Sequence, residues 1–96
     1  MSVASFLEAV YALAEHIIGE ALSNQAKSLI RNYFEDAGNV ELSERALYAV
    51  QKYTQVELPT LDSVLGKPRS SDLSPPETLI LRIHDEAVAL REEYNR

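Results

Sequence analysis

The chain has 96 residues, of which 46% are hydrophobic and 25% charged, and its net charge is −6. This composition is typical of one small globular domain and excludes a disordered chain, and the negative charge disfavours nucleic acids and anionic membranes as partners. The absence of cysteine excludes disulfides, cysteine-ligated zinc and cysteine nucleophiles.

The first apolar segment, residues 3–22, is long enough to cross a bilayer. Its charged and polar side chains, Glu8, Glu15, His16 and Glu20, would each be costly there. No lysine or arginine precedes the segment, although a signal peptide needs a basic start. We therefore expect a cytoplasmic protein that has no membrane partner.

The same segment predicts a helix that is buried along most of its length. Its apolar residues recur at steps of four and three: Val3, Leu7, Val10, Ala14, Ile17 and Ala21. Ser2 or Ser5 can cap its start, and Gly19 weakens its last turn. Ser23 and Asn24 are capping residues, which predicts a break before a second helix. One long bent helix through both segments is the alternative.

Two further helices are expected in the middle of the chain. Residues 24–37 carry a second apolar seam, and Gly38 is suited to end that helix in a left-handed conformation. A third seam follows over residues 42–53, with Asn39 or Ser43 as the expected cap. It should end near residue 54 because the following residues do not favour a helix.

The last third of the chain predicts a short helix, a loop and a long helix. Residues 58–65 form the short helix, with Pro59 in its first turn, and the loop covers residues 66–73. Ser74 and Glu77 then form a capping box at the start of the long helix. Its seam repeats at steps of three and four: Ile80, Ile83, Ala87, Leu90 and Tyr94.

These elements predict an all-α fold, a small antiparallel helical bundle of four main helices plus one short helix. A single domain should span residues 1–96. The last helix should lie against the first, since these two seams are the longest and most regular.

The sequence gives no support for a metal site, a cofactor or an enzyme. His16 and His84 have acidic neighbours, but neither a Glu-x-x-His nor a His-x-x-x-His spacing occurs, and adjacent helical residues point about 100° apart. The glycines are isolated and no nucleophile elbow is present, so we expect no phosphate-binding loop and no catalytic residues. An enzyme would show either a bound metal or a pocket lined by His16 and His84.

A DNA-binding regulator is one alternative, because residues 24–54 have the outline of a helix-turn-helix. The start of the second helix in that unit carries Glu41 and Glu44, which repel phosphates, and only Arg45 is positive. We therefore expect no nucleic acid partner. DNA binding would require Arg45, Lys67 and Arg69 to share one face.

Protein binding has better support. Tyr48 lies away from the apolar seam and lines up with Glu44. Glu41 lies one turn before Glu44. An exposed tyrosine among carboxylates suits a basic partner surface. A second acidic group lies on the last helix: Asp85, Glu86, Glu92 and Glu93. Tyr11 is a further candidate, at the edge of the first seam.

These residues predict a non-enzymatic module that binds another protein. Its sharpest form is a small acidic inhibitor of the immunity or antitoxin type, whose carboxylates occupy a basic groove on the partner. A structural or adaptor subunit is the other alternative, because a homodimer could bury the wide apolar face of the first or last helix.

Overall fold

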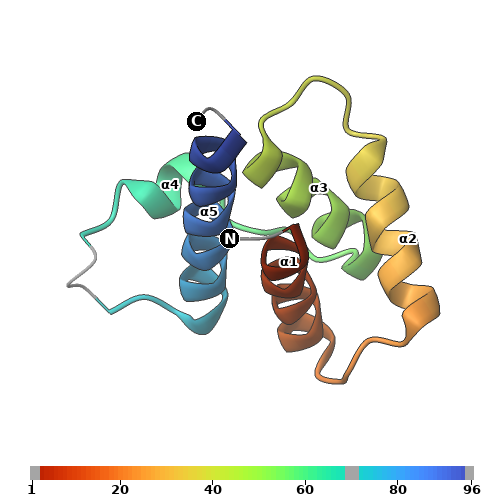
Figure 1. Ribbon diagram of the computed structural model, residues 1–96. Helices are drawn as coiled ribbons and strands as arrows, with labels where there is room; N and C mark the ends of the chain where they lie inside the picture. Colours follow the sequence, from red (N-terminus) through yellow and green to blue (C-terminus); the bar gives the residue numbers. More distant parts are fainter. Residues whose placement is uncertain (1–2, 69–71, 95–96) are drawn as a thin grey trace.

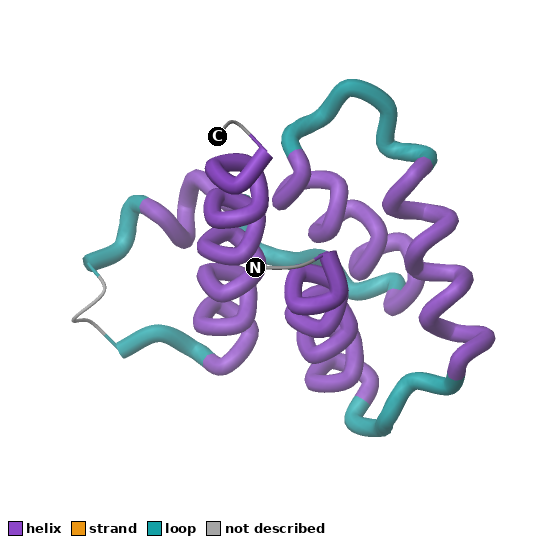
Figure 2. Tube along the Cα trace, viewed as in Figure 1, coloured by secondary structure: helices purple, strands orange, loops and turns teal. Residues whose placement is uncertain are grey.

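The computed structural model describes residues 3–68 and 72–94, and within these ranges the chain is helical and contains no strand (Figures 1 and 2). The helices are α1 (Val3–Ile18), α2 (Asn24–Glu35), α3 (Leu42–Thr54), α4 (Leu61–Leu65) and α5 (Pro75–Tyr94). The predicted all-helical class, with four main helices and a short one, is confirmed.

Helices α1, α3 and α5 pack against one another, while α2 packs on α3 and α4 on α5. The prediction that the last helix lies against the first is confirmed. An antiparallel bundle is supported only in part, since α1 and α2 are consecutive in the chain but make little contact. Figure 1 shows α2 lying on the outer side of α3, away from α5.

The core is built from all five helices. Its largest fully buried side chains are Phe6, Val10, Leu13, Ile30, Val50, Val64, Ile80 and Ile83. Most of these residues lie on the seams that the sequence predicts, so the periodic apolar pattern positions the helices correctly.

The break between the first two helices is confirmed, and the single bent helix is wrong. Helix α1 ends at Ile18, four residues before the predicted end, because Gly19 adopts a left-handed φ of 78°. Farther along this connection, the Glu15 carboxylate accepts a hydrogen bond of 2.8 Å from the backbone N–H of Leu22. Because this carboxylate ties the connection back to α1, Leu22 stays next to the core without being helical.

Ser23 caps α2 as predicted, since its hydroxyl oxygen accepts a hydrogen bond from the N–H of Ala26 at 3.1 Å. Helix α2 ends at Glu35, two residues earlier than expected, and Gly38 takes the left-handed conformation with a φ of 69°. Ser5 lies inside α1 and is not its cap, while Ser2 lies outside the described residues.

The predicted cap of α3 and the predicted start of α4 are wrong. Helix α3 begins at Leu42, where its seam begins, but the residue at the cap position is Glu41, which makes no side-chain cap, so neither Asn39 nor Ser43 caps this helix. Ser43 is already buried in the first turn. Helix α4 begins at Leu61 instead of Pro59, because the hydroxyl of Thr60 accepts the N–H of Ser63 at 3.2 Å. A side chain that accepts this hydrogen bond defines the helix start better than proline does.

The capping box of α5 is confirmed in both directions. The backbone N–H of Ser74 donates to the Glu77 carboxylate at 2.9 Å, and the N–H of Glu77 donates to the Ser74 hydroxyl at 3.3 Å. The Lys67 ammonium also forms an ion pair with the buried Glu77 side chain. These contacts, of which the Lys67 hydrogen bond is the largest, lower the pKa of Glu77 from 4.5 to about 2.

Glu77 should therefore give the protein a pH-dependent part of its stability. Its pKa is lower in the folded chain, so the ionised carboxylate stabilises the fold above pH 4.5, and this contribution is lost as the pH falls towards 2. We expect Glu77→Gln to lower the urea midpoint at pH 7 and to narrow its difference from wild type below pH 4.5. If Glu77→Gln lowered the urea midpoint by the same amount at pH 7 and below pH 4.5, the assignment of this stabilisation to the ionised Glu77 carboxylate would be contradicted.

Candidate protein-binding groove

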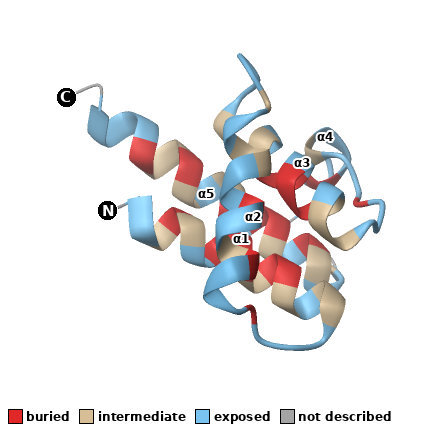
Figure 3. Cartoon of the chain, turned by 90° about the vertical axis from the view of Figure 1, so that its right-hand side faces the viewer, coloured by how far each residue is buried: buried red, intermediate tan, exposed pale blue. Residues whose placement is uncertain are grey.

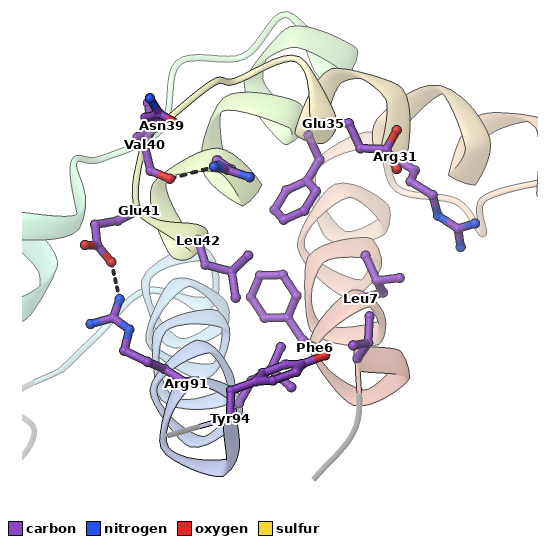
Figure 4. A pocket seen from close by; sticks show the side chains of 14 residues that line it. Phe6, Leu7, Arg31, Glu35, Asn39, Val40, Glu41, Leu42, Arg91 and Tyr94 are labelled. Carbon is purple, nitrogen blue, oxygen red and sulfur yellow. Dashed lines mark hydrogen bonds and ion pairs between the residues drawn. The ribbon is translucent and has the colours of Figure 1, made fainter. Parts of the chain in front are cut away.

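An open groove of about 820 Å³ lies at one end of the molecule. Its walls come from the start of α1, the end of α2, the α2–α3 connection, the start of α3 and the end of α5. Figure 4 shows these segments arranged around a central group of apolar side chains. No single helix forms this surface, which depends on helix ends that are far apart in the sequence.

The floor of the groove is apolar. Phe6 projects from α1 towards Phe34 of α2, and their ring centroids are 5.8 Å apart with the planes tilted by 55°. Leu7, Leu42 and Leu90 complete this surface. The tilted arrangement of the two rings is favourable for aromatic side chains, so the floor is well defined before any partner binds.

The mouth of the groove exposes large apolar residues to solvent. Val3 is 49% exposed, Val40 42% and Tyr94 77%. The expectation that Tyr94 belongs to the buried seam of α5 is wrong, because Leu90 is the last buried residue of that helix and the final turn extends beyond the core (Figure 3). Exposed apolar residues gathered around one hollow are typical of a surface that binds another molecule.

The rim of the groove is charged and carries more positive than negative side chains. Its charged residues are Arg31, Glu35, Glu41, Arg45 and Arg91. Arg91 forms an ion pair with Glu41, and the Nε of Arg45 donates to the Val40 carbonyl at 2.8 Å (Figure 4). The α2–α3 connection is thereby fixed to α3 on one side and to α5 on the other.

The first predicted contact group lies partly on this rim. Glu41 belongs to the groove, but its carboxylate is already paired with Arg91. Glu44 and Tyr48 lie on the exposed side of α3 and do not line the groove. The predicted exposure of Tyr48 is confirmed, and the ion pair shows that Glu41 has a structural role that the sequence did not indicate.

The second predicted group is divided between two places on α5. Glu92 and Glu93 are exposed in the last turn, next to Arg91, whereas Asp85 and Glu86 line a separate hollow of about 430 Å³. Glu86 does not belong to a fully solvated face, because it is half-buried and accepts a hydrogen bond from the Ser5 hydroxyl at 3.1 Å. None of these four carboxylates lines the groove.

Tyr11 is not an exposed contact residue. It is 9% exposed, and the Lys27 ammonium lies 5.5 Å from its ring centroid. Arg31 donates to the Tyr11 hydroxyl at 3.5 Å. These contacts make Tyr11 a link between α1 and α2, in addition to the ring contact between Phe6 and Phe34.

The two histidines do not form a site together with acidic groups. Within the described residues, no group of three or more histidine, cysteine, aspartate or glutamate side chains is placed to hold a metal ion. His16 is exposed, while the Nδ1 atom of His84 is buried and has no hydrogen-bond partner among the described residues. Neither histidine lines the groove or the smaller hollow.

The basic residues that DNA binding would require lie in different parts of the structure. Lys67 is engaged by Glu77 at the start of α5, and Arg45 lies on the rim of the groove. Arg69 lies outside the described residues. The ion pair of Lys67 makes its charge less available to a phosphate.

The sequence pattern predicts the apolar lining residues of α1 and α5 as parts of buried seams, because their spacing matches those seams. Val3 and Tyr94 differ from the rest of their seams in that each is the end residue of its helix and is exposed. Val40, an apolar residue in a polar connection, is the one local signal of this surface.

Comparisons with protein-family models, with curated proteins and with solved structures give no significant match to this chain. No helix among the described residues combines the length and the hydrophobicity that crossing a bilayer requires.

Proposed function

We propose that this chain is a non-enzymatic module that binds another protein, and that the groove is its main contact surface. The observation that supports this most directly is the apolar floor with Tyr94, Val3 and Val40 exposed around it. The described residues that line the groove include no histidine, serine or lysine, and their apolar side chains favour binding.

A more specific form of this proposal is a small acidic inhibitor of the immunity or antitoxin type that acts in the cytoplasm. The net charge of −6 supports it, as do the exposed Glu44 and Tyr48 on α3 and Glu92 on α5. Such a protein would place its acidic faces over a basic surface of the partner, where they would exclude nucleic acid or substrate. The apolar groove would hold a part of the same partner.

Val40→Asp tests the groove. Val40 and Val56 are both loop valines with similar exposure, 42% and 44%, but only Val40 lines the groove. We expect Val40→Asp to weaken binding of the partner captured from the cells that make the protein by about 2 kcal/mol, roughly 30-fold, since it places a charge at the centre of an apolar contact. Val56→Asp should leave binding unchanged. Calorimetry with the purified partner measures both.

Variants on the acidic face of α3 test the alternative contact surface. If Glu44→Lys and Tyr48→Ala release the partner while Val40→Asp retains it, the contact surface is that face and the groove is not involved. Circular dichroism of each variant checks that the helices are intact. We expect them to be, because the four substituted side chains, Val40, Glu44, Tyr48 and Val56, are all exposed.

A further inference from the structure

We infer that the groove holds a short amphipathic helix whose apolar face is flanked by acidic side chains. This inference rests on the proposed function, because it identifies the kind of segment that a partner would insert. It follows from three properties of the groove: its lining, its dimensions and the charge of its rim.

The lining favours a helix over an extended peptide. Backbone N–H and C=O groups that enter an apolar surface must keep their hydrogen bonds. An extended peptide keeps these hydrogen bonds best at the edge of a sheet, and the described ranges contain no strand. A helix satisfies these groups internally and presents only side chains to Phe6, Phe34 and Leu42.

The dimensions fit a few large side chains from one helical face. The groove measures about 820 Å³ and is open along one side. Helices that bind in such grooves insert apolar residues at positions i, i+3 or i+4, and i+7. Tyr94, which is 77% exposed at the mouth, can close over an inserted side chain without unpacking the core.

The rim favours acidic flanks. Three of the nine lysine and arginine residues of the chain lie here, against two glutamates, so the described lining residues have a charge of +1 within a chain of −6. Glu41 pairs with Arg91, while Arg31 and Arg45 keep terminal guanidinium nitrogens without a carboxylate among the described residues. Guanidinium groups bind carboxylates in a bidentate manner, which suits glutamate or aspartate beside the apolar face.

The whole-chain charge and the local charge give opposite expectations. The net charge of −6 attracts a basic peptide, and the arginines of the rim attract an acidic one. At about 0.15 M salt the Debye length is about 8 Å, so side chains on the rim should dominate over distant charges. Whether the groove prefers an acidic or a basic peptide therefore shows which of the two charges controls binding.

A displayed peptide library gives this answer directly. We would present helices of about 15 residues with leucine or phenylalanine at i, i+3 and i+7, and with flanking positions randomised between glutamate and lysine. Selection is carried out on the intact protein at about 0.15 M salt, with counter-selection on Val40→Asn, which leaves the charge of the rim unchanged. We expect glutamate to be enriched at the flanks. Enrichment of lysine, or no dependence on Val40, would overturn the inference.

A matched pair of charge reversals locates the effect. Arg31→Glu removes a rim arginine, while Arg82→Glu makes the same change of charge at an exposed residue on α5 outside the groove. By fluorescence polarisation, we expect Arg31→Glu to weaken the selected acidic peptide about tenfold and Arg82→Glu to change its affinity much less. Equal losses would mean that overall charge controls binding, which contradicts the inference.

The two proposals fail in different ways. If the native partner depends on Val40 but the library selects basic flanks or an extended sequence, the groove binds protein and the acidic helix is wrong. If the native partner is indifferent to Val40, the proposed function fails. Sedimentation of the protein alone tests whether a second copy of the chain occupies the groove. A dimer that Val40→Asp dissociates would overturn the helix inference.

Discussion

Leu13→Ala is expected to lower the free energy of unfolding by about 2–5 kcal/mol. Leu13 is fully buried on α1, the helix that packs against both α3 and α5. Removing its side chain leaves a cavity between packed helices that cannot move together without losing other contacts. Because a domain of this size has only about 5–15 kcal/mol of stability, a urea titration followed by circular dichroism should show a large shift of the midpoint.

Leu29 provides the matched control for this substitution. It is also a helical leucine, but it is 43% exposed on α2. Leu29→Ala removes the same atoms and should cost less than about 1 kcal/mol, because little of its surface is buried. Similar losses for the two variants would mean that α1 is not the centre of the core.

Gly19→Ala is expected to cost about 1–2 kcal/mol, the second largest effect on stability. The φ of Gly19 is 78°, and a Cβ atom built at this position meets nothing within 4 Å. The cost therefore comes from forcing an L-residue into the left-handed region and involves no clash. The same denaturation measurement gives its value.

Gly19→Asn separates backbone conformation from other causes. Asparagine tolerates the left-handed region better than alanine does, so it should recover part of the lost stability even though its side chain is larger. If asparagine costs as much as alanine or more, the loss arises from side-chain bulk, and the explanation by φ is wrong.

The helices could be predicted because their pattern is local. The seams of α1 and α5, the break at Ser23 and the capping box at Ser74 all depend on residues within a few positions of one another. The cap residues of α3 and α4 were predicted less well, since several residues compete to be the cap. Helix α4 begins after Thr60, and not at Pro59, because the Thr60 hydroxyl accepts a single hydrogen bond from the N–H of Ser63.

The groove could not be predicted, because it depends on which helix ends meet. Val3 and Tyr94 have the spacing of seam residues, and nothing local shows that no further helix covers them. The ion pair between Glu41 and Arg91 likewise joins residues fifty positions apart in the chain. Such contacts follow from the packing order of α1, α3 and α5, which the apolar periodicity leaves open.

Two helices that pack together line the groove from the two ends of the chain: α1 contributes Val3, Phe6 and Leu7, and α5 contributes Leu90, Arg91 and Tyr94. The surface is therefore absent from a growing polypeptide until residue 94 has emerged from the ribosome. Recognition through the groove would then be confined to chains whose synthesis has passed that position, and incomplete products of translation would not compete for the same target.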